Sequence, residues 1–122
     1  MIFPIGSNIY IAGPMRGCSL FNFQLFFYWA ERLEQSGYEV LNPAAFDVER
    51  MIKGWKFEED NYEEVLEFDL AVIENCADAL FMLKGWGKSE GAGREYAKAK
   101  ELGLAIFDEP PHGDGKIVLE TR

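Results

Sequence analysis

Short apolar runs alternate with longer amphipathic segments along the chain. Each run has four or five residues and ends near glycine, proline, asparagine or a charged residue, which is typical of a buried strand. The first run (NIYIA) stops at Gly13-Pro14, and the second (YEVL) stops at Asn42-Pro43. We therefore predict strands at residues 8–12, 38–41, 79–83 and 104–107.

The segments between these runs have helical periodicity. Residues 21–36 are predicted as a helix whose sheet-facing side is formed by Phe23, Phe26, Phe27, Ala30 and Leu33. A second helix is predicted within residues 59–76. A third starts after Ser89, a good N-cap residue, and ends before Gly103. A short helix at 47–52 is also expected.

Alternation of strands and helices predicts the fold. It indicates an α/β protein with a doubly wound parallel sheet of four to five strands and helices on both faces. Residues 1–122 form one domain in this interpretation, with 108–115 as a linker. Residues 116–120 (KIVLE) are expected to form a last strand or an ordered tail.

The helix at 21–36 has more apolar residues than one face can hold. Beyond its sheet-facing side it carries Phe21, Leu25, Tyr28 and Trp29. A helix that is apolar nearly all round is usually buried on both sides. We therefore expect a homodimer or larger homo-oligomer. The alternative is that segment 44–60 or the tail 108–122 covers this face within one chain.

The net charge and the apolar content of the chain limit the kinds of molecule that it is expected to bind. Of the 122 residues 48% are hydrophobic, and the formal net charge is −9. An acidic domain does not attract a nucleic-acid polymer over long range, but a few local donors can still hold a small phosphorylated molecule. The start of the chain lacks the features of a signal peptide, and no run approaches ~20 apolar residues. We expect a cytoplasmic protein with no membrane partner.

Cysteine and histidine are scarce. The two cysteines, Cys18 and Cys76, lie far apart and form no CxxC pair, so free thiols are expected. One histidine, His112, makes a zinc site improbable.

Candidate site residues converge at the carboxyl edge of the predicted sheet, where such folds bind ligands. The loops after the first three strands all open there, and the third leads into the helix that carries Glu95. The preceding helix runs back along the sheet, which brings Asp69 toward the same edge. Asp78, in contrast, belongs to the opposite edge, where it would act as a turn residue.

The start of the helix after Ser89 resembles an anion site. Free N–H groups at a helix start bind phosphate, and glycines such as Gly91 and Gly93 allow close approach. Arg16, between glycines at a strand exit, is a candidate phosphate clamp. Each residue also has an ordinary interpretation: solvated helix acids for Asp69 and Glu95, a plain cap for Ser89, and a surface cation for Arg16.

Four segments together resemble a known superfamily. IYIAGPMRG (9–17), GYEVLNPA (37–44), FDLAVIENCAD (68–78) and GWGKSEGAGREYAKAKELGLAI (85–106) occur in this order. The chain is similar to the nucleoside 2-deoxyribosyltransferases and the 2-deoxynucleoside 5-monophosphate N-glycosidases. It looks most like a branch of small phage and bacterial proteins with the YIAGPMRG pattern. This resemblance implies a flavodoxin-like fold and no metal or cofactor.

The resemblance implies residue roles by position. Glu95 matches the nucleophile, Asp69 the residue that assists the leaving base, and Tyr10 a tyrosine bordering the sugar. Ser89, Gly91 and Gly93 match the phosphate-binding turn, and Gly13, Arg16 and Gly17 belong to the neighbouring loop. Asn42 and Trp86 are weaker candidates for the base pocket. Relatives often complete the site with a residue from a neighbouring subunit.

The expected function is cleavage of the base–sugar bond of a deoxynucleoside 5-monophosphate through a covalent glycosyl-enzyme. Two carboxylates beside a phosphate site suit this chemistry, because one can attack the sugar while the other handles the proton. One alternative is base exchange by a nucleoside 2-deoxyribosyltransferase. Another is a non-catalytic nucleotide-binding protein.

Overall fold

A computed structural model describes residues 1–56, 61–111 and 117–121 of the chain. All predicted strands and helices of this part are present. In chain order the elements are β1 (Asn8–Ala12), η1 (Ser19–Asn22), α1 (Phe23–Gln35), β2 (Glu39–Leu41), α2 (Pro43–Ile52), α3 (Tyr62–Cys76), β3 (Ala79–Met82), η3 (Trp86–Lys88), α4 (Glu90–Leu102) and β4 (Ala105–Asp108).

The four strands form one parallel sheet in the order β2-β1-β3-β4. The chain leaves β1 for β2 on one side and later returns to β3 on the other side, so the strand order reverses at β1. The predicted doubly wound, flavodoxin-like arrangement is therefore confirmed. In such sheets the crevice at the reversal point, outside the carboxyl ends of the strands, is the favoured ligand site.

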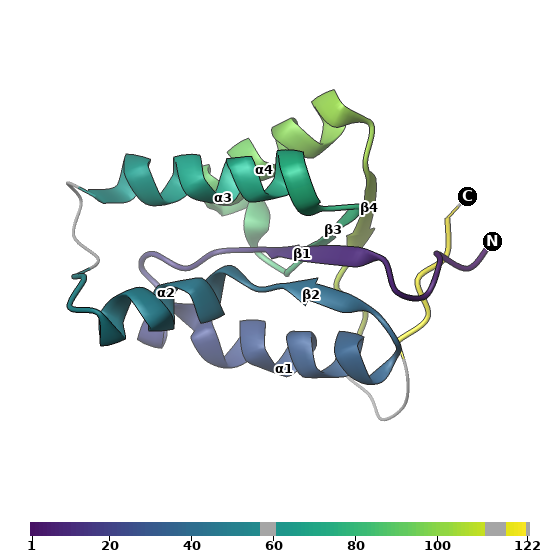
Figure 1. Cartoon of the computed structure of the whole chain (residues 1–122), viewed down its shortest axis with the longest axis horizontal. Coiled ribbons are helices and arrows are strands. Elements are labelled where there is room, and N and C mark those ends of the chain that lie inside the picture. Colours follow the sequence, from purple (N-terminus) through teal and green to yellow (C-terminus); the bar gives the residue numbers. More distant parts are fainter. Residues whose placement is uncertain (57–60, 112–116, 122) are drawn as a thin grey trace.

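Helices cover both faces of the sheet (Figure 1). On one side α1 packs with α2. Phe26, Trp29 and Leu33 of α1 share a core there with Ile9 of β1 and Phe81 of β3. On the other side α3 and α4 lie next to each other. The core on that side joins side chains of two helices and two strands: Ile73, Ala99, Tyr10, Ala12, Leu80 and Met82.

The C-terminal tail closes the α1 side of the molecule. Ile117 and Leu119 are buried in the core that contains Trp29. The tail pairs with the N-terminal segment through one antiparallel bridge, Ile2 with Glu120, rather than joining the sheet. The described residues thus form a four-stranded sheet, and KIVLE is an ordered tail as far as it is described. Residues 112–116, which include part of the predicted linker, lie outside the described residues.

The buried face of α1 differs from the prediction at two positions. Phe27, expected on the sheet, is 43% exposed, and Trp29, expected to point away, is 1% exposed. The stripe formed by Phe26, Trp29, Ala30 and Leu33 has helical spacing, and Phe27 lies beside it. Trp29 is covered because its ring contacts Phe81 on the sheet, with ring centroids 5.5 Å apart, and because the tail packs there.

Local capping explains the early start of α2. The helix begins at Pro43 rather than near Asp47, because the Asn42 side chain accepts a hydrogen bond from the Ala44 N–H at 3.0 Å. Proline at the first helical position fits this start, since its missing N–H has no partner there in any helix. This start places Asp47 on the helix that follows the carboxyl end of β2.

Candidate active site

A cavity of about 430 Å³ opens at the carboxyl edge of the sheet. Its walls come from segments far apart in the sequence: the loop after β1, the starts of α2, α3 and α4, and part of α1. They include Gly13, Met15, Arg16, Phe21, Phe26, Pro43, Asp47, Tyr62, Leu66, Asp69, Ser89, Gly91 and Glu95. The predicted convergence of Asp69 and Glu95 on one pocket is therefore present in the structure.

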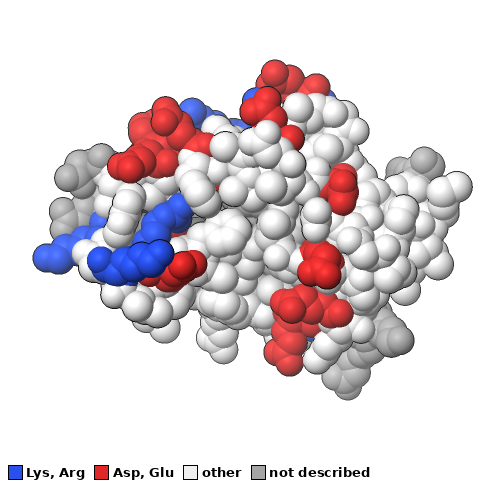
Figure 2. All heavy atoms as spheres, in the orientation of Figure 1, with Lys and Arg blue, Asp and Glu red and all other residues white. Residues whose placement is uncertain are grey.

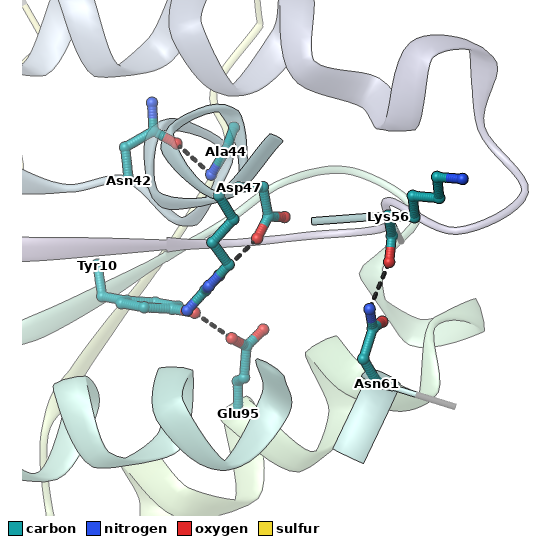
Figure 3. Close-up of polar contacts among 8 residues, drawn as sticks. Tyr10, Asn42, Ala44, Asp47, Lys56, Asn61 and Glu95 are labelled. Carbon is teal, nitrogen blue, oxygen red and sulfur yellow. Dashed lines mark hydrogen bonds and ion pairs between the residues drawn. The ribbon is translucent and has the colours of Figure 1, made fainter. Parts of the chain in front are cut away.

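Glu95 lies deep in this cavity and contacts Tyr10. The Tyr10 hydroxyl donates a hydrogen bond to Glu95 Oε2 (Figure 3). Burial raises the pKa of Glu95 well above its usual range and the Asp69 charge raises it further, whereas the hydrogen bond from Tyr10 lowers it. Burial and the Glu95 charge likewise raise the pKa of Tyr10, so its hydroxyl keeps the proton that it donates.

Asp69 reaches the same space from α3. Its side chain is buried, and Oδ1 accepts no hydrogen bond from the part of the chain that the structure describes. Burial raises the pKa of Asp69 to about 7, and the Asp47 charge adds to this effect while Arg50 opposes it. A buried acceptor without a donor is costly. Asp69 is therefore placed to hold a proton near neutral pH or to accept a hydrogen bond from a ligand.

Asp47 is a third carboxylate in the cavity, and it is not among the site residues predicted from the sequence. It is buried, and its Oδ1 accepts a hydrogen bond from Arg50 at 2.7 Å. Burial raises the pKa of Asp47 to about 6, against the opposing effects of Arg50 and Arg16. In Figure 3 Asp47 extends from α2 toward Tyr10 and Glu95. An acid five residues after Asn42, close to the carboxyl end of β2, was the signal in the sequence.

The start of α4 forms another wall of the cavity. Ser89 caps this helix by accepting from the Ala92 N–H at 3.2 Å. Tyr62 of α3 lies against it, since a Cβ added at Gly91 would come 3.1 Å from the Tyr62 hydroxyl. The Arg16 guanidinium carbon lies 4.6 Å from the centre of the Tyr62 ring. A cation and a helix N-terminus thus border the cavity together.

Several predicted site residues lie outside the cavity wall. Asn42 caps α2 instead, and Trp86 stacks on Tyr96, with ring centroids 4.6 Å apart. Gly17 forms an exposed turn with φ of 81°, and Gly93 lies one turn into α4, outside the wall. Tyr10 does not line the cavity itself, but its hydroxyl donates a hydrogen bond to Glu95, which does. Local sequence did not show these partners, because each depends on packing between distant segments.

Positive charge gathers at one end of an acidic molecule. On the face in Figure 2, Lys and Arg side chains cluster beside the grey segment where α2 ends, and acidic side chains lie directly beside this cluster as well as elsewhere on the face. Arg50 and Lys53 line a groove between α2 and α3 there, and Arg50 packs over the Phe68 ring, 4.7 Å from its centre. Arg50 pairs with Asp47 and Lys53 pairs with Glu49, so part of this positive charge is matched within α2.

Comparison with known proteins places the chain in a family. A model described as "Domain of unknown function (DUF4406)" matches residues 7–108, which include the whole sheet and every cavity residue named above. The chain belongs to the DUF4406 family. No curated protein matches it. Within the described part of this DUF4406 chain, no helix is both long and apolar enough to cross a membrane.

Proposed function

We propose that the protein is an N-glycosidase that cleaves the base–sugar bond of a deoxynucleoside 5-monophosphate. The observation that carries the proposal is the buried cluster of Tyr10, Asp69 and Glu95 in one cavity at the reversal point of the sheet. Perturbed carboxylates in a cleft are common at catalytic sites, because a ligand-free core gains nothing from burying them.

Glu95 acts as the nucleophile in this mechanism. Its oxygen attacks C1′ of the sugar while the bond from C1′ to the base nitrogen breaks, and the bonding electrons leave with the base. Tyr10 orients the Glu95 carboxylate through the hydrogen bond to Oε2. The product of this step is a glycosyl ester on Glu95 and a free base.

Asp69 moves the proton. With a pKa of about 7 it can hold a proton near neutral pH, which it gives to the departing base. Water then attacks C1′ and passes a proton back to Asp69, and Glu95 leaves as a carboxylate. The reaction needs the proton of this pair on Asp69 and the charge on Glu95, and the hydrogen bond that Tyr10 donates to Glu95 favours that arrangement.

The phosphate binds at the start of α4 in this proposal. Ser89, the free N–H groups of the first turn and Arg16 border the cavity on that side. Helix N-termini bind phosphate through exposed N–H groups and the helix dipole. The remaining space of the cavity accommodates the sugar and base.

We further propose that the protein acts in the cytoplasm as a homodimer or larger homo-oligomer. Both described cysteines, Cys18 and Cys76, are free thiols, which agrees with a reducing compartment. Phe27 and Tyr28 of α1 remain 43% and 36% exposed after the tail has covered Trp29. A second copy of the chain would bury this outer face of α1.

A substrate panel tests the proposed activity. Purified protein is incubated with deoxynucleosides and their 5-monophosphates, and free base is measured by liquid chromatography. We expect base release from at least one monophosphate, and none from Glu95→Gln, which keeps the size of the side chain but removes its nucleophilicity. Addition of a second free base reports exchange in the same assay.

A trapped intermediate tests the nucleophile. With a slow 2-fluoro sugar substrate, mass spectrometry should find one sugar adduct on Glu95. Glu101→Gln is the matched control, because Glu101 lies near the other end of the same helix, is exposed and does not line the cavity. An adduct on another residue, or an active Glu95→Gln protein, would refute the mechanism.

A further inference from the structure

Asp47 has features that the proposed reaction does not use. It is buried, it lines the cavity, and it comes from α2, whereas the reacting groups come from β1, α3 and α4. Arg50 Nη1 donates a hydrogen bond to Asp47 Oδ1 at 2.7 Å. Among the described residues, no group donates a hydrogen bond to Asp47 Oδ2. The carboxylate is thus held in one orientation with an acceptor left over for a ligand.

The position of Asp47 in the fold indicates which part of a ligand it would meet. β1 lies between β2, which leads into the helix of Asp47, and β3, which leads toward the start of α4. Asp47 therefore enters the cavity from the side opposite to the phosphate site proposed at the start of α4. In a nucleoside 5-monophosphate the base lies at the end away from the phosphate, so Asp47 would meet the base.

The cavity that Asp47 lines also has apolar wall residues suited to a flat ring. Phe21, Phe26 and Pro43 line the cavity together with Asp47, and they offer apolar surface without competing donors. Aromatic and apolar walls with one fixed polar group are typical of sites that orient a heterocycle. A carboxylate accepts hydrogen bonds and donates none while ionised.

We propose that Asp47, oriented by Arg50, selects bases that carry an exocyclic amino group, such as cytosine and adenine, over their oxo counterparts. This inference rests on the proposed function and specifies its substrate class. The amino group donates to Oδ2, whereas an oxo group would set a lone pair against the carboxylate. A site that accepts a hydrogen bond from a ligand rejects analogues that leave it unpaired.

Exchanging the carboxylate for an amide should reverse the preference. In Asp47→Asn, Arg50 still donates to the side-chain oxygen, so the amide NH₂ turns toward the cavity and replaces an acceptor with a donor. We compare kcat/KM for the 5-monophosphates of deoxycytidine and deoxyuridine, and of deoxyadenosine and deoxyinosine. The wild type should favour the amino base, and the amino-to-oxo ratio should fall roughly tenfold to a hundredfold in Asp47→Asn.

Two further variants support the comparison. Glu49→Gln is the control, because Glu49 is an exposed acid on the same helix, paired with Lys53, and its loss should leave the ratio unchanged. Asp47→Glu keeps the charge but shifts the carboxylate by one methylene, and it should lose the preference without reversing it. This variant keeps the test decisive if Asp47→Asn folds poorly by circular dichroism.

The outcomes separate this inference from the proposed function. An unchanged amino-to-oxo ratio in folded Asp47→Asn overturns the inference while base release stands. Tighter binding of every monophosphate, regardless of base, would place Asp47 beside the phosphate and also overturn it. If no substrate releases base, the proposed function fails. Calorimetry of the same four nucleotides with Glu95→Gln protein then decides separately whether the cavity prefers amino bases.

Discussion

At the scale of single residues, burial controls the chemistry of the cavity. Asp47, Asp69 and Glu95 are acids in a molecule that already carries a formal net charge of −9. Water is largely excluded from all three, so each ionised form costs free energy. Arg50 offsets part of this cost at Asp47, and the Tyr10 hydroxyl offsets part of it at Glu95.

This cost predicts that the free energy of unfolding depends on pH. The pKa of Asp69 is about 7 in the folded protein against a reference value of 3.8, so the folded state binds more protons between these values. The free energy of unfolding therefore falls as pH rises through this window, and Asp47 and Glu95 act in the same direction. We expect a higher melting temperature near pH 5 than near pH 8.

Replacing Asp69 should flatten this dependence. Asp69→Asn removes the titrating group while keeping its shape, so its melting temperature should exceed that of the wild type near pH 8 and match it more closely near pH 5. Glu67→Gln, an exposed acid on the same helix, is the control. A wild type whose melting temperature rises from about pH 5 to pH 8 would contradict the assigned burial of charge.

Ser89 carries a separate prediction about binding. Ser89→Ala should raise KM for monophosphates roughly tenfold more than for the matching nucleosides, because the hydroxyl and the helix start contact only the phosphate in the proposed complex. The variant also loses its N-cap bond to Ala92, which costs about 1 kcal/mol of stability. Equal changes in KM for both substrate types would show that no phosphate binds there.

At the scale of elements, the ends of β1 and β3 pack closely against each other beside the cavity. A Cβ added at Gly13 would lie 2.7 Å from the Cβ of Leu83, which follows β3 and is fully buried. The two strand ends can approach this closely only because residue 13 has no side chain. This approach fixes the loop that carries Arg16 against the cavity.

Two glycine substitutions test the close packing of the two strand ends. Gly13→Ala should lower the free energy of unfolding by about 1–3 kcal/mol, since buried neighbours must move. Gly93→Ala is the matched control in α4, where a Cβ would meet nothing within 4 Å. It should leave stability unchanged or raise it by up to about 1 kcal/mol, because alanine favours helix. Chemical denaturation measures both, and a neutral Gly13→Ala would contradict the close packing.

At the scale of the whole molecule, the C-terminal tail covers part of the apolar surface of α1. Trp29, Ile117 and Leu119 are buried together, and α2, which lies mostly in segment 44–60, also packs against α1, so both intrachain covers considered for this helix contact it. Phe27 and Tyr28 nevertheless stay exposed, and Leu20 just before the helix is 78% exposed. The interface between copies proposed above would bury these exposed apolar side chains.

Light scattering tests the assembly. We expect at least a dimer at micromolar concentration, and Phe27→Glu should shift it to the monomer because the charge would be buried in the interface. Phe68→Glu is the control, since Phe68 is 49% exposed on a different helix. A monomeric wild type would reject the proposed dimer.

The sequence by itself determined the order of elements and the edge at which the acids gather. Apolar runs of four or five residues and amphipathic helices are local patterns, and parallel sheets bring the carboxyl ends of their strands together. From these rules alone Asp69 and Glu95 fall beside one pocket, and Asp78 falls at the other edge, where its carboxylate accepts the Asn8 N–H at 2.8 Å.

Only the tertiary structure decided which side chain meets which. Asp47 reads in the sequence as an ordinary partner for Arg50 three residues later, yet it is buried in the cavity wall. Trp86 could have faced a ligand but stacks on Tyr96, and Trp29 lies under a tail almost ninety residues away along the chain. Such contacts join segments distant in sequence, and their free energy comes from close packing, which no local pattern of hydrophobic and polar residues encodes.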